Sequence, residues 1–192
     1  MDIAGSPTRM RWSISRARSW GYSRIKAVEV AMGVFAQATG ISTVCARLTG
    51  MFGPFQDPEQ ASLVPRLVHA AVSGKPPDLK EVFLSGEDDG VGLVYIKDTA
   101  RAIALLQGKE KLNHSVYNVG SEGNIPNREL VEAVKKAVPG FQVKLPPGKG
   151  SFPPLPVMST KRLQEDTGFE PRFDLPTAIK DYVEWLRAGN PK

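Results

Sequence analysis

The sequence predicts an α/β fold built around an incomplete parallel sheet. Strand-like and helix-like segments alternate along the chain, which is typical of α/β proteins. The length of 192 residues and the hydrophobic share of 41% suit one globular unit with a real core. Only residues 42–48 and 115–119 have the pattern of central parallel strands, which is too few for a complete doubly wound sheet.

Composition narrows the class of protein further. Every apolar run is shorter than the ~18–20 residues of a membrane-spanning helix, so we expect no membrane partner. One cysteine, Cys45, excludes an internal disulfide framework, and the two histidines have no spacing typical of metal ligands. We therefore expect a cytoplasmic protein without a metal site, in which Cys45 is a core residue of a strand.

The positive charge lies at one end of the chain. The net charge is +5, and residues 1–26 hold six basic residues against one acidic residue, whereas the remainder is balanced. Residues 1–20 are a basic leader rich in Arg and Ser. Three interpretations stay open: a disordered or non-native leader, an organelle import signal, or a basic arm that contacts phosphates. We favour the first, expect no nucleic-acid partner, and place the folded domain at residues 21–192.

Residues 21–40 are expected to form the first helix, because apolar residues recur every three or four positions and Gly40 ends the pattern. Residues 42–48 are apolar and partly β-branched, which predicts a buried strand, and the Gly and Pro residues of 49–60 predict a loop. A second amphipathic helix follows at 63–72. The residues expected on the buried face of the first helix are Ile25, Val28, Met32 and Phe35.

The remaining elements alternate in the same way. The prolines of 146–156 exclude regular structure there. Short strands are predicted at 81–84, 92–96, 115–119 and 141–145. Helices are predicted at 99–106 and 128–138, from Ser159 to Thr167 and from Asp174 onward, with Asp98, Ser159 and Asp174 as N-caps.

Tyr22 and Lys26 carry the clearest chemical signal. They stand four residues apart at the start of the first predicted helix, so their side chains project from one face. A lysine ammonium beside a phenol lowers the pKa of the tyrosine, which can then exchange a proton with a substrate hydroxyl or carbonyl oxygen. This is the acid–base half of hydride transfer, in which a cofactor carries the electrons. The alternative is an exposed Tyr and Lys on a helix surface.

Five segments form an ordered set of motifs along the chain. They are Tyr-Ser-Arg-Ile-Lys-Ala-Val-Glu from Tyr22, Ala-Arg-Leu-Thr-Gly-Met-Phe-Gly-Pro from Ala46, Val-Tyr-Ile-Lys-Asp-Thr-Ala-Arg-Ala from Val94, Val-Tyr-Asn-Val-Gly from Val116, and the tail from Lys161 to Leu186. In this order they resemble the extended short-chain dehydrogenases/reductases of the NAD-dependent epimerase/dehydratase family, and the resemblance covers residues 20–189. It implies a partial Rossmann-like fold, NAD or NADP as cofactor, and an oxidoreductase, epimerase or dehydratase activity.

The resemblance also implies site residues. Tyr22 would be the catalytic acid/base, and Lys26 would lower its pKa and hydrogen-bond the nicotinamide ribose. Tyr22, Lys26 and Thr49 are therefore the candidate cofactor-binding residues, with Thr49 beside the nicotinamide. Residues 50–60 and the helix from Ala61 would border a small-molecule substrate. Because the Tyr/Lys helix of this family often packs into a dimer interface, the resemblance also implies a homodimer.

The sequence does not show the glycine-rich turn of the nucleotide-binding half that the resemblance requires. No close pair of glycines follows a strand and opens a helix with a third glycine in place, as a pyrophosphate-binding turn needs. None of the serines in the leader has the context of the family's catalytic Ser or Thr. We therefore expect the C-terminal half of such an enzyme, a truncated chain, and a non-catalytic protein-binding module is the alternative function.

Two departures from the family pattern bear on the substrate. Gly50 stands where the family often has Asn, and Val91 stands near the place of an Arg that binds phosphate in nucleotide-sugar members. Both favour a smaller sugar acid, ketone or aldehyde over a nucleotide sugar. Arg47 is expected to hold the strand end through backbone carbonyls, and His69 is expected to have a surface or core role.

Overall fold

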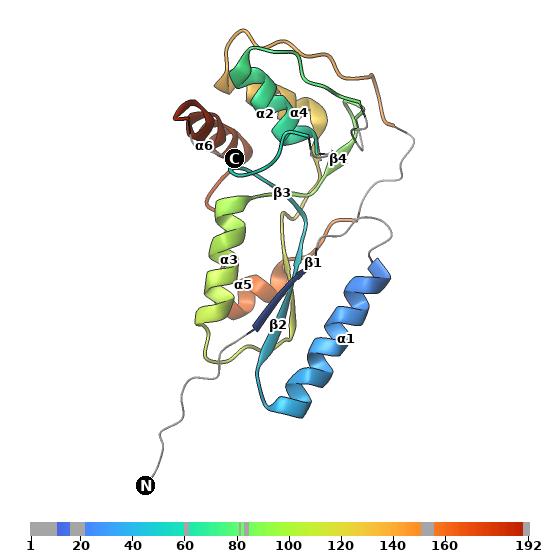
Figure 1. Cartoon of the computed structure of the whole chain (residues 1–192), viewed down its shortest axis with the longest axis vertical. Helices are drawn as coiled ribbons and strands as arrows, with labels where there is room; N and C mark the ends of the chain where they lie inside the picture. Colours follow the sequence, from blue (N-terminus) through green and yellow to red (C-terminus); the bar gives the residue numbers. More distant parts are fainter. Residues whose placement is uncertain are drawn as a thin grey trace.

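The computed structural model describes residues 11–15, 22–59, 62–80, 82, 85–150 and 156–189, with side chains described from Lys26 onward. A sheet of three parallel strands lies at one end of the molecule, and a lobe of three helices lies at the other (Figure 1). The strands follow the order β1-β2-β6. They are β1 (Arg11–Ser15), β2 (Thr43–Leu48) and β6 (Val116–Val119).

Helices cover both faces of this sheet. Val44 and Ala46 of β2 are 3% and 2% exposed and share a core cluster with side chains of α3 (Ile96–Gly108) and α5 (Lys161–Thr167). On the opposite face lies α1 (Tyr22–Thr39) (Figure 1). The α/β class and the central strand predicted from the sequence are confirmed, because an apolar strand with helices on both faces is the arrangement of parallel sheets.

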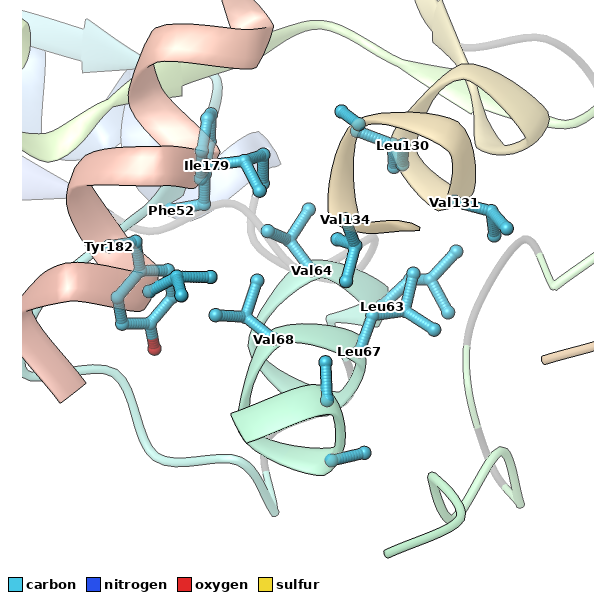
Figure 2. Packing of buried hydrophobic residues seen from close by; sticks show 14 of the residues in the cluster. Phe52, Leu63, Val64, Leu67, Val68, Leu130, Val131, Val134, Ile179 and Tyr182 are labelled. Atoms are coloured by element: carbon cyan, nitrogen blue, oxygen red, sulfur yellow. The ribbon is translucent and has the colours of Figure 1, made fainter. Parts of the chain in front are cut away.

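The lobe holds the larger hydrophobic core. Figure 2 shows apolar side chains of α2 (Leu63–Ser73), α4 (Asn127–Ala137) and α6 (Leu175–Arg187) meeting at its centre. As predicted, α6 begins at its N-cap Asp174, whose Oδ1 accepts a hydrogen bond from the Thr177 backbone N–H at 2.8 Å. Two strand pairs lead into the lobe. They are β3 (Gly50–Phe52) parallel with β5 (Leu93–Tyr95), and β4 (Gly90–Val91) antiparallel with β7 (Ile125–Pro126).

Two predicted elements differ from the structure, and a third lies mostly outside the described residues. The loop predicted at 49–60 contains β3, because a partner strand more than 40 residues later supplies its hydrogen bonds. Of the strand predicted at 81–84 only Val82 is described, and it lies outside any strand. Residues 141–145 alternate like a strand, but no strand of the described part of the chain pairs with them; Phe141 and Leu145 pack individually in the core of the lobe.

The leader also differs from the expectation in part. Arg11–Ser15, within residues 1–20, form β1 and pair with β2 from Arg11–Thr43 to Ser15–Arg47. A strand of this kind carries no local sequence signal, because its hydrogen bonds depend on an edge supplied by β2. The other residues of the leader lie outside the described part of the chain, so the division at residue 20 stays a prediction.

Helix α1 has the predicted bounds to within one residue but not the predicted burial. Val28 and Phe35, expected on its buried face, remain 40% and 38% exposed, and Val30 and Val34 are 67% and 61% exposed. From residue 27 to the end of the helix, the sequence holds one charged side chain, Glu29. A helix that is apolar on most sides is normally buried, so α1 presents a surface suited to another protein layer.

Across the described ranges, neither α1 nor any other helix is long and apolar enough to cross a bilayer.

Candidate active site

The carboxyl ends of β1, β2 and β6 share one edge of the sheet, and this edge faces the lobe (Figure 1). Ligands of open parallel sheets bind outside this edge. Six residues separate the end of β1 from Tyr22, the first residue of α1, and Thr49 directly follows β2. The start of α1 and the residue after β2 therefore reach the same edge, where the sequence places its candidate site.

Lys26 lies one helical turn after Tyr22, as predicted. Its Nζ is 3.4 Å from Oε2 of Glu29, and its side chain is 44% exposed. The side chain of Tyr22 lies outside the described residues, so its approach to Lys26 stays a prediction. The helical spacing alone puts positions 22, 26 and 29 on one face of α1.

Glu29 and Arg47 form the strongest polar contact between α1 and the sheet. Arg47 donates from Nε to Oε1 and from Nη2 to Oε2 of Glu29, each at 2.6 Å. The hydrogen bond from Arg47 is the main reason why the pKa of Glu29 is lowered. Arg47 was expected to bind backbone carbonyls; its described contact is with a carboxylate, because α1 brings Glu29 over the strand. Sequence reasoning missed Glu29, although its place one turn after Lys26 was a usable signal.

Thr49 stands at the sheet edge in close contact with Gly120, the residue after β6. Its backbone N–H donates to the Val119 carbonyl at 3.1 Å, and its hydroxyl is buried without a hydrogen-bond partner among the described residues. A Cβ at position 120 would lie 2.3 Å from Cγ2 of Thr49. The glycine is therefore required for this close approach, and a contact between Thr49 and a nicotinamide stays a prediction.

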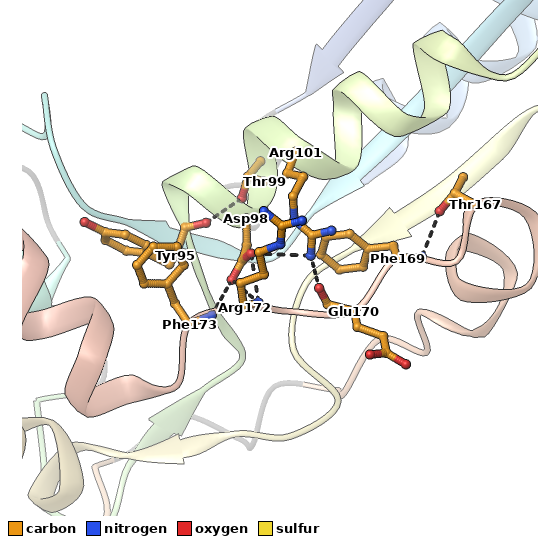
Figure 3. A network of polar contacts seen from close by, with 9 residues as sticks. All are labelled: Tyr95, Asp98, Thr99, Arg101, Thr167, Phe169, Glu170, Arg172 and Phe173. Carbon is orange, nitrogen blue, oxygen red and sulfur yellow. Dashed lines mark hydrogen bonds and ion pairs between the residues drawn. The ribbon is translucent and has the colours of Figure 1, made fainter.

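A polar network joins the start of α3 to the C-terminal segment (Figure 3). Asp98 is 2% exposed, and its carboxylate accepts hydrogen bonds from the backbone N–H groups of Arg172 and Phe173 at 3.0–3.1 Å. The helix itself begins two residues earlier, at Ile96, so Asp98 is not its N-cap, contrary to the prediction. The carboxylate instead binds backbone N–H groups that lie 74 or more residues later in the chain, and no local sequence pattern predicts such a contact.

The same junction encloses a cavity of about 190 Å³ between the sheet and the lobe. Apolar and aromatic side chains make up most of its wall, and Asp98 is one of the polar residues that line it. Gly120, which follows the carboxyl end of β6, also lines it. The residues around it include Phe52, Leu93, Tyr95, Ser121, Ile125 and Phe173.

The two sequence departures have structural counterparts. A Cβ on Gly50 would lie 3.0 Å from Cδ2 of Leu93 and 3.1 Å from the Gly92 carbonyl oxygen, so the pairing of β3 with β5 favours glycine there. Val91 packs against the hydrophobic core of the lobe. Neither position offers a cation to a ligand.

The other single residues fall in structural positions. Cys45 is buried in β2, as predicted. His69 is half-buried, and its Nε2 lies 3.0 Å from the Tyr182 hydroxyl, which ties α2 to α6. Ser159 was predicted to cap α5, but Thr160 is the N-cap. No three His, Cys, Asp or Glu side chains within the described ranges are grouped to hold a metal ion.

The chain matches the family model described as "NAD dependent epimerase/dehydratase family" over residues 8–120. A dTDP-glucose 4,6-dehydratase of Streptomyces niveus is 28% identical over 152 residues, which cover 77% of this chain and 43% of the relative. The chain thus spans about half the length of the curated relatives it matches.

Solved structures share the fold over about half of their own length. A UDP-glucose 4-epimerase of Thermotoga maritima, solved with UDP-glucose, has a TM-score of 0.68 at 22% identity, covering 86% of this chain and 52% of its own. A dTDP-glucose 4,6-dehydratase of Bacillus anthracis in complex with NAD has a TM-score of 0.69 at 19% identity, covering 92% and 54%. With a family match over more than half of its length, the chain belongs to the NAD-dependent epimerase/dehydratase family.

Proposed function

We propose that this chain is the substrate-side half of an NAD(P)-dependent oxidoreductase, epimerase or dehydratase that acts at a hydroxyl- or carbonyl-bearing carbon. The observation that carries the proposal is the position of Lys26, one turn into a helix that starts at the carboxyl edge of the parallel sheet. Tyr22 precedes it by four residues on the same helical face. Tyr22 is then the acid/base and Lys26 the residue that favours its phenolate.

The described residues fit one end of a dinucleotide. Tyr22, Lys26 and Thr49 would hold the nicotinamide and its ribose at the sheet edge. In the described ranges no glycine-rich turn leads from a strand directly into a helix, so these residues offer no seat for the pyrophosphate. These observations support a chain whose residues hold the nicotinamide and the substrate, while another structural unit holds the rest of the cofactor.

The proton is the part of the chemistry that this chain would handle. The nicotinamide, when bound, supplies hydride transfer. The Tyr22 hydroxyl would take the proton of a substrate hydroxyl during oxidation of the carbon, and would return it to a carbonyl oxygen during reduction. Lys26 would stabilise the phenolate form through its positive charge, and Thr49 would limit the space beside the ring.

A small, sugar-like or carbonyl substrate is favoured over a nucleotide sugar. Position 91 is an apolar residue packed on the core of the lobe, and position 50 is a glycine enclosed by its partner strand. A diphosphate needs cations or oriented N–H donors, and neither position supplies a side-chain donor. The relatives named above act on or bind dTDP- and UDP-sugars, so a sugar acid, ketone or aldehyde is a distinct proposal for this chain.

The experiment that tests the proposal is a fluorescence titration of NADH and NADPH with the protein and, where the gene encodes a longer chain, with that chain. We expect binding with a dissociation constant in the micromolar range, and loss of most of it in Lys26→Met. The second candidate, a protein-binding module, is favoured by the exposed apolar side of α1. That candidate predicts no saturable binding of either cofactor by any of these proteins, and such a result would overturn the first proposal.

A homodimer formed through α1 is a further expectation from the family. Val30 and Val34 are the most exposed large apolar residues among the described side chains of the helix, so they would lie in the interface. We expect sedimentation of a dimer by the wild-type chain and of a monomer by Val30→Lys/Val34→Lys, because two buried charges without partners oppose association. Gln107→Lys, at an exposed position of α3, is the matched control and should still dimerise. A wild-type chain that stays monomeric at tens of micromolar would contradict this expectation.

A further inference from the structure

Glu29 and Arg47 connect α1 to the centre of the sheet through a two-pronged ion pair. Both contacts are 2.6 Å, and the side chains are 11% and 30% exposed. A paired fork of this kind fixes orientation as well as distance, because both N–H groups must align with both oxygens. The pair therefore specifies how the first turns of α1 sit on β2.

The place of this pair in the fold puts it beside the candidate site. Arg47 is the one charged residue in the sequence of β2, and it stands next to the last residue of the strand, in register with Ser15 of β1 and Asn118 of β6. Glu29 lies three residues after Lys26 on the same face of α1. Further along the helix, the Thr43 hydroxyl donates to the Met32 carbonyl at 3.2 Å. The ion pair is thus the attachment nearer to Lys26.

The charges of the three residues are arranged unequally. Arg47 contacts both oxygens of Glu29 at 2.6 Å, whereas Lys26 contacts only Oε2, at 3.4 Å. A carboxylate that lacked its arginine would draw the ammonium of Lys26 toward itself. With Arg47 in place, the negative charge of Glu29 is balanced from the sheet side, and Lys26 adds a second positive charge to the group.

We infer that Glu29 and Arg47 are positioning residues: they fix the start of α1 over the carboxyl edge of the sheet, and their charges cancel so that Lys26 presents its charge toward Tyr22. This inference rests on the proposed roles of Tyr22 and Lys26. Neither residue touches substrate or cofactor in this account; both act through Lys26.

The test is a spectrophotometric titration of tyrosinate in the whole chain, which needs no substrate. The chain has four tyrosines. Burial raises the pKa of Tyr95 and Tyr182, and burial together with the hydrogen bond to Asp166 raises the pKa of Tyr117 to about 12. The tyrosine that ionises at lowest pH should therefore be Tyr22, and the first step of the titration should vanish in Tyr22→Phe.

The two positioning variants should move that first step in opposite directions. Glu29→Gln removes a negative charge and should lower the midpoint by about 1 pH unit. Arg47→Met leaves the carboxylate unbalanced and should raise it by a similar amount. The double variant restores the balance and should return within a few tenths of the wild-type value. Glu132→Gln, on the exposed side of α4, is the matched control and should not move the midpoint.

Each outcome decides the inference. If the pair had only a structural role, the midpoint would move in the same direction in both single variants or would not move in either. Either result would overturn the inference. If a single variant does not fold, the double variant decides: a midpoint at the wild-type value supports charge balance, and a displaced one overturns it. Lys26→Met separates the two proposals, because its failure to raise the midpoint would contradict the Tyr22–Lys26 pair itself.

Discussion

Replacing Tyr22 by phenylalanine is expected to lower kcat/KM for hydride transfer by roughly 10²–10⁴-fold, because the substitution removes the hydroxyl group that exchanges the proton and changes little else. The ring keeps its shape and the helix keeps its spacing, so cofactor binding should change far less than turnover. The measurement is NAD(P)⁺ reduction with polyols and sugar acids, using the gene product with any further chain that the gene encodes.

Tyr182→Phe is the matched control for this variant. Tyr182 is buried in the lobe, and its hydroxyl lies 3.0 Å from Nε2 of His69. Loss of that hydroxyl should cost about 1 kcal/mol of unfolding free energy and leave turnover nearly unchanged. Full activity in Tyr22→Phe would contradict the assignment of Tyr22 as the acid/base.

Replacing Asp98 by alanine is expected to cause the largest loss of stability among single substitutions outside the hydrophobic core. The carboxylate is 2% exposed and accepts the backbone N–H groups of Arg172 and Phe173. Its removal leaves two donors without acceptors, at about 3 kcal/mol in total. The segment that closes the cavity between the sheet and the lobe would also lose its attachment to α3.

Chemical denaturation of Asp98→Ala, Asp98→Asn and Asp88→Ala tests this expectation. Asparagine keeps one acceptor oxygen, so its loss should be about half that of alanine. Asp88 pairs with Arg128 at the surface, where both side chains are more than a third exposed, and its removal should cost less than about 1 kcal/mol. Equal midpoints for Asp98→Ala and Asp88→Ala would show that the buried network contributes little.

Local pattern predicted much of the secondary structure. The helical spacing from residue 63, the apolar run at 42–48 and the cap at Asp174 each depend on neighbours within one or two turns. Residues 141–145 show the limit of that reasoning, because alternation predicts a strand only when another strand is available as a partner. The same holds in reverse for β1 and β3, which lack a strong pattern and exist because an edge pairs with them.

The candidate site likewise has a part that local sequence patterns predicted and a part that they did not. Tyr22 and Lys26 could be recognised from a spacing of four residues, and the order of the motifs indicated the family that the comparisons confirm. The ion pair of Arg47 with Glu29 joins two elements and residues that are 18 positions apart, so no local pattern predicted it. The exposure of Val30 and Val34 could not be read from the helix either, because burial depends on what lies across from a face.

The sequence by itself determined the class of the fold, the order of its helices and the four-residue spacing of Tyr22 and Lys26, since these follow from spacing along the chain. Only the tertiary structure decided what the buried charges bind and which apolar faces remain uncovered. The physical reason is that a carboxylate such as Asp98 or Glu29 is stabilised by whichever donors the fold brings to it. Those donors come from β2 for Glu29 and from the C-terminal segment for Asp98.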